Sequence, residues 1–337
     1  MSGGKEIKID VVKLALAAQL VVFGLVGLGE IGIGIKIPMI REVVIFIYLT
    51  FIPGILILKF LKVKTNPIKT LLLSIGMSLS VVTLLSTSVN LILTPFCERP
   101  FSELPLTISI GAFVLFLILL CWFKEDHYYI FSFSFSPMYL LPLFLPIFIA
   151  IGRAGGNDTL IFITLIIVSI LPVIILLSKT NEGIYPLIIW TISLSLMFLR
   201  LIFEHRFNMR FDDQTPIISE AVKIACSWDP HFPVTHNSLL LPTIFPSVFS
   251  ILSGIDIAIG TRALGCIIFS IIPVVLYVIY REFLTPVRSL LASCLYAFYP
   301  FYPQLPLITR TGFAFLFVSL FLLLVSSKEI SLKSRHF

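Results

Sequence analysis

One polar stretch of the chain holds most of the residues that could do chemistry. It runs from Glu204 to about His236 and contains two adjacent carboxylates, Asp212 and Asp213, directly before Gln214-Thr215-Pro216. A carboxylate beside a membrane can take a proton from an acceptor hydroxyl during group transfer, or hold a divalent metal ion. The same pair can instead stabilise the start of a helix through the helix dipole. Residue types by themselves favour this second, structural interpretation.

A short helix is predicted immediately after the two carboxylates. Apolar residues recur at helical spacing, with Pro216 at the first helical position and Thr215 as its cap. Ser219, Glu220 and Lys223 would occupy the opposite face. We therefore expect an amphipathic helix on the outer membrane surface, with its apolar side formed by residues 217, 218, 221, 222, 224 and 225.

Arginine and histidine side chains accompany this pair. The planar guanidinium group binds phosphate through two hydrogen bonds, and a lipid phosphate would lie at this depth. Taken singly, an interfacial arginine more often marks the end of a membrane span. The histidines lack metal-binding spacing such as HExxH, and Asp229-Pro230 could simply begin a turn. The accompanying residues are His205, Arg206, Arg210, Asp229, His231, His236, Arg262 and Arg310.

The remainder of the chain is too apolar for a soluble protein. It is 58% hydrophobic and 12% charged, with a mean hydropathy of +1.06, whereas soluble domains are about 25% charged. The net charge of +6 comes from lysines and arginines in short loops, which indicates membrane orientation rather than a nucleic-acid partner. The five cysteines form no CxxC pair and are interpreted as small core residues.

The hydropathy pattern predicts an all-α bundle of about ten membrane spans in contact with membrane lipids. With both termini in the cytoplasm, fourteen of the 24 lysines and arginines lie on the inner side, which agrees with the positive-inside rule. We expect a multi-pass cell-membrane protein. The predicted spans are 11–29, 43–61, 70–94, 106–123, 137–152, 159–178, 184–203, 262–280, 287–304 and 311–327.

One apolar segment, residues 239–255, is short for a span and is broken by Pro242 and Pro246. We expect it to lie in the outer interface or to dip back into it. The sequence suggests two regions. Residues 1–182 hold six spans, and residues 183–337 hold the outer loop, 204–240, with its neighbouring spans.

Two early segments read REVVIFIYLTFIPGILILKFLKV, residues 41–63, and KTLLLSIGMSLSVVTLLSTSVN, residues 69–90. These segments resemble the opening of an archaeal family of large, uncharacterised multi-spanning membrane proteins. The resemblance covers nearly the whole chain through diffuse, mostly apolar motifs. In and after the outer loop it includes Asp213, Ala221, Trp228-Asp229-Pro230, His236-Asn237-Ser238, residues 240–246 and Arg310.

Those proteins in turn resemble the C-type glycosyltransferases, which take a sugar from a polyprenyl-phosphate donor at the outer face of a membrane. In that superfamily a first long outer loop carries an essential acidic residue. The resemblance implies that Asp213 is the catalytic carboxylate, that Asp212 assists it or binds a metal ion, and that Arg310 binds the donor phosphate. The sequence identifies no cofactor beyond such a divalent ion. Further candidates for substrate binding are Arg206, Arg210, His236 and Asn237.

Two features depart from the family. Relatives tend to place a glutamate a few residues after the aspartate, where this chain has Ile217 and its nearest acid is Glu220. Relatives also continue beyond Arg310 with further spans and often an outer domain, whereas this chain ends one span later. This suggests a truncated or split gene product with a separately encoded C-terminal partner.

Three functions are therefore compared. The first is a membrane glycosyltransferase, or its N-terminal part, that uses a lipid-phosphate-linked sugar. The second is a non-catalytic scaffold or partner subunit. The third is a transporter or flippase of lipid-linked sugars, which the near absence of charges inside the spans makes less favoured.

Overall fold

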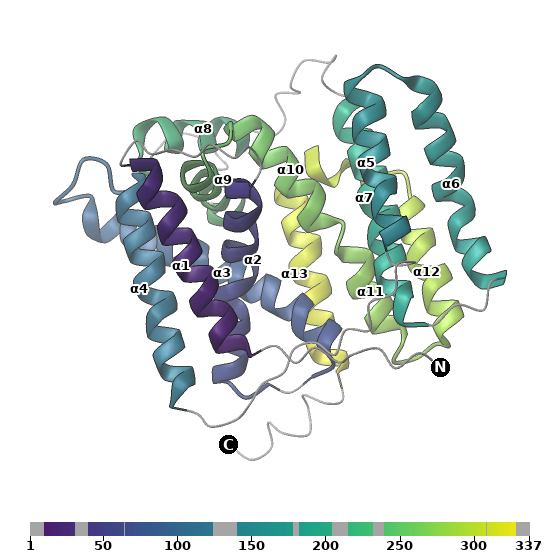
Figure 1. The fold of residues 1–337 in the computed structure, drawn as a ribbon, viewed down its shortest axis with the longest axis horizontal. Helices are drawn as coiled ribbons and strands as arrows, with labels where there is room; N and C mark the ends of the chain where they lie inside the picture. Colours follow the sequence, from purple (N-terminus) through teal and green to yellow (C-terminus); the bar gives the residue numbers. More distant parts are fainter. Residues whose placement is uncertain are drawn as a thin grey trace. The chain divides into compact units, whose positions relative to one another are not determined.

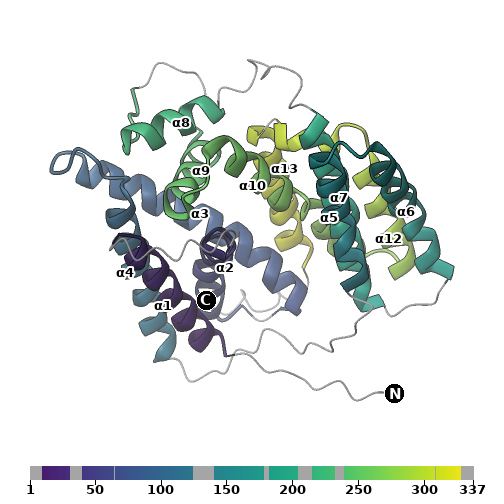
Figure 2. The ribbon, with the colours of Figure 1, turned by 45° about the horizontal axis from the view of Figure 1, so that its top comes forward.

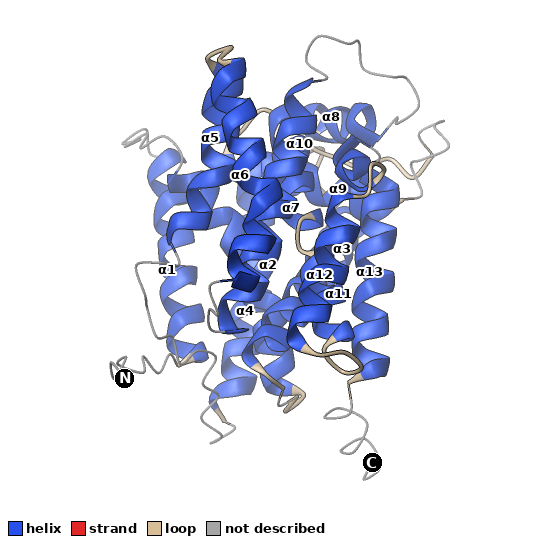
Figure 3. Cartoon of the chain, turned by 90° about the vertical axis from the view of Figure 1, so that its right-hand side faces the viewer, coloured by secondary structure: helices blue, strands red, loops and turns tan. Residues whose placement is uncertain are grey.

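The computed structural model describes residues 10–30, 40–63, 65–123, 140–177, 182–203, 215–231, 239–307 and 309–327. Within these ranges the chain forms helices and connecting turns, with no strand (Figure 3). The predicted all-helical class is confirmed. The α-helices are α1 (Val11–Glu30), α2 (Ile40–Phe60), α3 (Pro67–Leu93), α4 (Glu103–Trp122), α5 (Leu140–Ala154), α6 (Asp158–Leu177), α7 (Tyr185–Phe203), α8 (Thr215–Ala225), α9 (Leu240–Ser253), α10 (Ile257–Phe269), α11 (Ile272–Tyr280), α12 (Pro286–Phe298) and α13 (Thr309–Ser326), with 3-10 turns η2 (Glu182–Ile184) and η4 (Tyr302–Leu307).

Six helical segments among the described residues are long and apolar enough to cross a membrane. They are Ile40–Phe60, Pro67–Leu93, Glu103–Trp122, Asp158–Leu177, Glu182–Leu199 and Ile257–Tyr280. Shorter apolar helices cover Val11–Gly27, Pro142–Gly152, Leu240–Ser253 and Arg310–Ser326. The chain is thus a helical membrane protein.

The surface of α6 shows why a membrane is needed. Large apolar side chains lie exposed along one side of this helix, at a spacing of three or four residues. A soluble protein rarely exposes so large a continuous apolar face, whereas lipid solvates it. The residues are Phe162, Ile163, Ile166, Ile167, Ile170, Val173 and Ile174.

The helices pack into two compact units that interleave along the sequence. The α2 unit comprises residues 5–133 and 214–261, and so holds α1–α4, α8 and α9. The α7 unit comprises residues 1–4, 134–213 and 262–337, and holds α5–α7, α11–α13 and most of α10.

Within the α2 unit, α2 and α3 approach very closely. A Cβ atom added at Gly54 of α2 would lie 1.9 Å from the Ser74 carbonyl oxygen of α3. The Gly54 N–H, directly after Pro53 within α2, donates to Ser78 Oγ at 2.7 Å. Small residues let two backbones meet, and a serine hydroxyl satisfies a backbone group at a proline inside the membrane.

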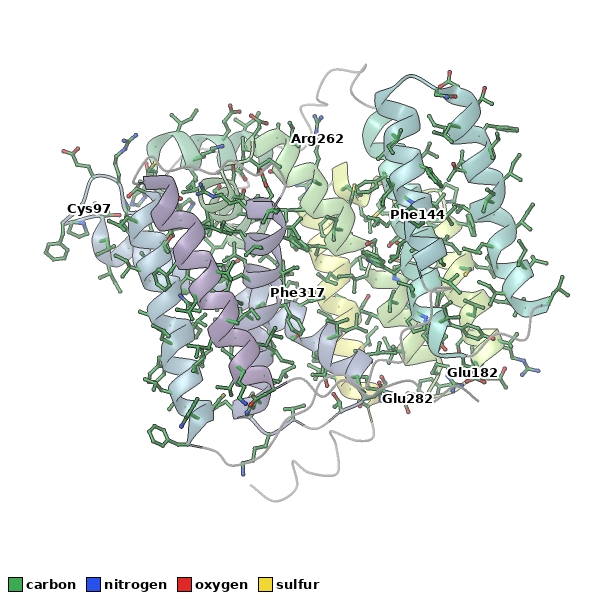
Figure 4. All side chains as sticks on the ribbon, in the orientation of Figure 1. Cys97, Phe144, Glu182, Arg262, Glu282 and Phe317 are labelled. Carbon is green, nitrogen blue, oxygen red and sulfur yellow. The ribbon has the colours of Figure 1, made fainter. Side chains whose placement is uncertain are left out.

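Within the α7 unit, α10 and α11 form one broken span. The break at Ser270 and Ile271 precedes Pro273, which has no N–H to continue the helix. Arg262 lies at one end of this unit, and Glu182 and Glu282 lie at the other (Figure 4). Arg281, which follows α11, forms an ion pair with Glu182 at 3.5 Å. The two helices together therefore run the length of the unit.

The span predicted at 287–304 is not one continuous helix. The α12 helix ends at Phe298, and Tyr299 is extended, with φ −62° and ψ 127°. Proline disfavours the helical conformation in the residue before it. Pro300 follows Tyr299 directly, so Tyr299 ends the helix. The chain resumes in η4 only at Tyr302.

Helix α9 does not cross the α2 unit. Near its C-terminus, the Leu252 carbonyl accepts hydrogen bonds from Arg41 at the start of α2. Near its N-terminus, the Thr243 carbonyl accepts from Ser219 of α8. Both ends of α9 therefore lie at one end of the unit, where α2 and α4 begin, α3 ends and α8 lies across it (Figures 1 and 2). We call this the α8 end.

Candidate functional site

The described residues include only one of the seven predicted site residues, Arg310. The other six, Arg206, Arg210, Asp212, Asp213, His236 and Asn237, lie outside the described ranges. We therefore describe the residues that follow Asp213 in the sequence, beginning with helix α8, and the residues that contact them. Helix α8 begins at Thr215, two residues after Asp213 in the sequence and one residue before the predicted first helical position, Pro216.

The packed face of α8 differs from the predicted one. Ser219, assigned to the polar face, is fully buried together with Ile218 and Val222. Ile217 and Ile224, assigned to the apolar face, are 49% and 70% exposed. The predicted division of this helix into an apolar contact side and a polar side is thus wrong at Ser219.

Two serine hydroxyls explain this orientation of α8. Ser219 Oγ donates to the Thr243 carbonyl at 3.0 Å and approaches the Pro242 carbonyl at 3.4 Å. Pro246 has no N–H to give the Pro242 carbonyl, four residues earlier, its usual helical partner. In return, Ser247 Oγ of α9 lies 3.0 Å from the Ser219 carbonyl. The carbonyl that Pro246 leaves without a helical donor therefore decides which side of α8 packs against α9.

The C-terminal half of α8 is also fixed. The Lys223 ammonium group donates to the Ile255 carbonyl at 2.9 Å, just beyond the end of α9. Cys226 then turns the chain in a left-handed conformation, with φ +50°. Its carbonyl accepts a 2.7 Å hydrogen bond from the Phe101 N–H in the turn before α4. The segment after α8 is thereby held against the α3–α4 connection.

A buried asparagine holds the next residue from both sides. Asn90 of α3 donates from Nδ2 to the Trp228 carbonyl at 2.8 Å, and its Oδ1 accepts from the Trp228 N–H at 2.9 Å. Ser227 Oγ also donates to Oδ1 at 3.3 Å. Residues 138 positions apart in the chain are thus joined at the α8 end.

An ion pair ties three further helices together at the same end. The Arg41 guanidinium group pairs with the Glu103 carboxylate at the start of α4. Its Nε and Nη2 also donate to the Leu252 carbonyl of α9, at 2.9 and 2.7 Å. The support beneath α8 is therefore a connected set of polar contacts rather than apolar packing alone.

The exposed polar side chains here include Glu220, Asp229 and His231. Asp229 Oδ1 accepts from the His231 N–H at 2.8 Å, which is the turn that Asp229-Pro230 predicts. The described residues contain no group of three His, Cys, Asp or Glu side chains that could hold a metal ion. They therefore provide no ligand set for the divalent ion that the resemblance implies.

Arg310 lies in the α7 unit, near the N-terminus of α13, and is exposed. The turn before it is held by buried Tyr302, whose hydroxyl bonds the Phe269 carbonyl at 2.8 Å. The Phe269 ring packs directly against Gly312, two residues after Arg310. A Cβ atom added at Gly312 would lie 2.4 Å from Cε2 of that ring. The start of α13 is thus fixed by its packing on α10.

Sequence reasoning missed Asn90, Arg41 and Glu103. The sequence gives only a weak indication that Asn90 matters. It is an amide near the C-terminal end of the long apolar helix α3, shortly before Thr94 and Pro95. Nothing in the sequence connects it to Trp228. No family model, curated protein or solved structure matches the chain.

Proposed function

We propose that the chain crosses the membrane ten times. The six long apolar segments supply six spans, and the shorter helices Val11–Gly27, Pro142–Gly152 and Arg310–Ser326 supply three. The tenth consists of α12 with η4. A 13-residue helix is about 20 Å long, which is less than the ~30 Å hydrocarbon core, so η4 would complete this crossing.

In this topology the α8 end faces outward, and the protein transfers a sugar there from a lipid-phosphate-linked donor to a surface acceptor. One observation carries this proposal. Helix α8, which begins two residues after Asp213, is fixed to the membrane helices through Ser219, Lys223 and the segment ending at Trp228. A catalytic group needs a rigid support close to the lipid phosphate.

The chemistry follows from the residue types. The Asp213 carboxylate would take the proton from an acceptor hydroxyl as its oxygen forms a bond to the anomeric carbon of the sugar. The bond from that carbon to the phosphate oxygen breaks, and the lipid phosphate leaves. Arginine side chains, with Arg310 as the main candidate, would bind the phosphate through paired hydrogen bonds.

The test is Asp213→Asn, which keeps the side-chain volume and removes the base. Transfer of radiolabelled sugar from farnesyl-phosphate mannose and farnesyl-phosphate glucose would be measured in membranes that contain native acceptors. We expect loss of transfer with normal membrane insertion. Glu220→Gln on exposed α8 is the matched control and should retain activity. Full activity of Asp213→Asn would rule out the assignment.

A non-catalytic partner subunit is the second candidate, favoured by the exposed face of α8. Ile217 and Ile224 lie seven residues apart on that face, both well exposed. Such a stripe can bind another protein or lie in lipid. Copurification in mild detergent tests it. A partner that is lost in Ile224→Glu and retained in Glu220→Gln would support this function over catalysis.

A transporter is less favoured by the distribution of charge. Among the described residues only two charged side chains are classed as buried, Lys59 and Lys69. Both lie near helix ends, at the turn between α2 and α3. A transport path usually places ionisable groups at membrane depth.

A further inference from the structure

The turn between α2 and α3 lies at the end of the α2 unit opposite to the α8 end, because α2 ends and α3 begins there. Four lysines surround this turn, Lys59, Lys62, Lys64 and Lys69, whereas residues 43–97 contain no aspartate or glutamate. The hairpin therefore carries four positive charges near one turn and no carboxylate of its own. In the ten-span topology this end faces the cytoplasm.

Lys59 is a covered lysine without a partner. It lies in the last turn of α2 and is 8% exposed. Within the described part of the chain, its ammonium group makes no hydrogen bond and no ion pair. A lysine packed in this way buries its methylene stem and keeps its ammonium group at the surface, where an opposite charge stabilises it. An anion beside the end of α2 would supply the partner that Lys59 lacks.

Lys62 occupies a position that glycine usually takes. Its backbone is left-handed, with φ +56°, and its N–H donates to the Lys59 carbonyl at 3.0 Å. The Val63 N–H donates to the Leu58 carbonyl, also at 3.0 Å. This pair of hydrogen bonds ends many helices, and glycine is usual at the left-handed residue because a side chain is strained there. Despite that strain, the turn carries an exposed lysine directly after α2.

Two further residues suit the head group and chain of a lipid. Lys69 lies in the first turn of α3 and is 7% exposed. The dipole of α3 favours an anion at this end of the helix. Leu61, between Lys59 and Lys62 in the sequence, is 55% exposed. An apolar side chain beside positive charges fits a ligand that has both a phosphate and a hydrocarbon chain, because the phosphate lies where the hydrocarbon region ends.

We propose that the α2–α3 turn binds the phosphate group of an anionic phospholipid in the inner leaflet. Lys59 and Lys62 pair with the phosphate oxygens, Lys69 adds positive charge, and Leu61 contacts the acyl chain. Lysines at the cytoplasmic end of membrane spans attract anionic head groups in this way. The inference is independent of the proposed sugar transfer, and it uses the proposed topology only to assign the leaflet.

The first measurement is the amount of retained lipid. The full chain is placed in nanodiscs of equal parts phosphatidylcholine and phosphatidylglycerol, and native mass spectrometry counts the lipids that stay bound on release. Retained phosphatidylglycerol should fall about fivefold in Lys59→Gln and in Lys62→Gln, which is the effect of one lysine near the membrane surface. Lys59→Arg keeps the charge and should retain the lipid. Arg288→Gln, an exposed position assigned to the same membrane face, is the matched control and should leave retention unchanged.

The second measurement separates a lipid from a free ion. Phosphatidylglycerol added to the purified protein in detergent should raise its unfolding temperature, because the ligand binds only the folded chain. Inorganic phosphate should give no greater increase than sodium chloride of equal ionic strength. If Lys59→Gln does not yield folded protein, Lys62→Gln decides the question, since Lys62 is exposed.

Three results would overturn the proposal. Equal retention of phosphatidylglycerol by the parent and the lysine variants would show that the turn binds no lipid. An equal loss in Arg288→Gln would show that retention depends on total charge rather than on this turn. Stabilisation by inorganic phosphate as large as that by phosphatidylglycerol would show that the ligand is the free ion.

Discussion

The Tyr302 hydroxyl donates a 2.8 Å hydrogen bond to the Phe269 carbonyl at the break between α10 and α11. Pro273, four residues after Phe269, cannot supply the N–H that a continuous helix would give this carbonyl. Ser193 of α7 completes the arrangement, since its hydroxyl lies 2.6 Å from the Tyr302 oxygen. All of this is buried in the α7 unit, so a tyrosine from η4 replaces a missing backbone donor inside the membrane.

Tyr302→Phe should lower the free energy of unfolding in detergent by about 1 to 2 kcal/mol, because the Phe269 carbonyl loses its donor in a buried setting. Thermal unfolding of the purified protein measures this. Tyr299→Phe is the control, because Tyr299 is 60% exposed, and it should leave stability unchanged. Equal stability of the Tyr302 variant and wild type would show that water or another group satisfies the carbonyl.

Gly54→Ala should destabilise the α2 unit by several kcal/mol, because its Cβ would lie 1.9 Å from a backbone atom of α3 and the helices must separate. The matched control is Gly24→Ala, also in a predicted membrane span, where a Cβ meets nothing within 4 Å. That variant should be neutral or more stable by up to about 1 kcal/mol. The yield and unfolding temperature of the two purified variants measure this difference. Equal stability of Gly54→Ala and Gly24→Ala would contradict the close approach of α2 and α3.

Arg41→Gln should cost more stability than Glu103→Gln. Both side chains are about a quarter exposed, which limits their ion pair to roughly 0.5 to 1 kcal/mol. Arg41 also donates two hydrogen bonds to the Leu252 carbonyl, and these are lost only in the first variant. A double-mutant cycle on unfolding temperature separates the two contributions. A larger loss for Glu103→Gln would show that the ion pair dominates.

Cysteine labelling tests both the α8 packing and the outward orientation. In a background with Cys97→Ser and Cys226→Ser, Glu220→Cys should react with a membrane-impermeant maleimide in intact cells, because Glu220 is exposed. Ser219→Cys should stay unlabelled until the protein is unfolded, because Ser219 is fully buried. Labelling of Glu220→Cys only after the membrane is broken would reverse the predicted sidedness.

Much of the architecture was predictable from local pattern. Runs of about 20 apolar residues have one stable form in lipid, because every backbone N–H and carbonyl must be paired within the helix. The helices at α1–α7 accordingly coincide with predicted spans. Even the start of α8 followed from Thr215 and Pro216, since capping depends on neighbours in sequence.

The packed faces were not predictable in the same way. Hydrophobicity assigns Ser219 to a polar side, but its hydroxyl is buried because a carbonyl freed by Pro246 lies opposite. Likewise, Asn90 looks like one amide near the end of an apolar helix until Trp228 is placed beside it. In both cases the partner lies more than twenty residues away.

The sequence by itself determined that this protein is helical, lies in a membrane and carries its acidic pair directly before a short helix, because hydrophobicity, capping and proline act over a few residues. Tertiary structure alone decided that α8 buries a serine and that Asn90 and Tyr302 complete distant backbones. The physical reason is that a buried polar group must be paired, and only the folded chain shows which partner is within reach.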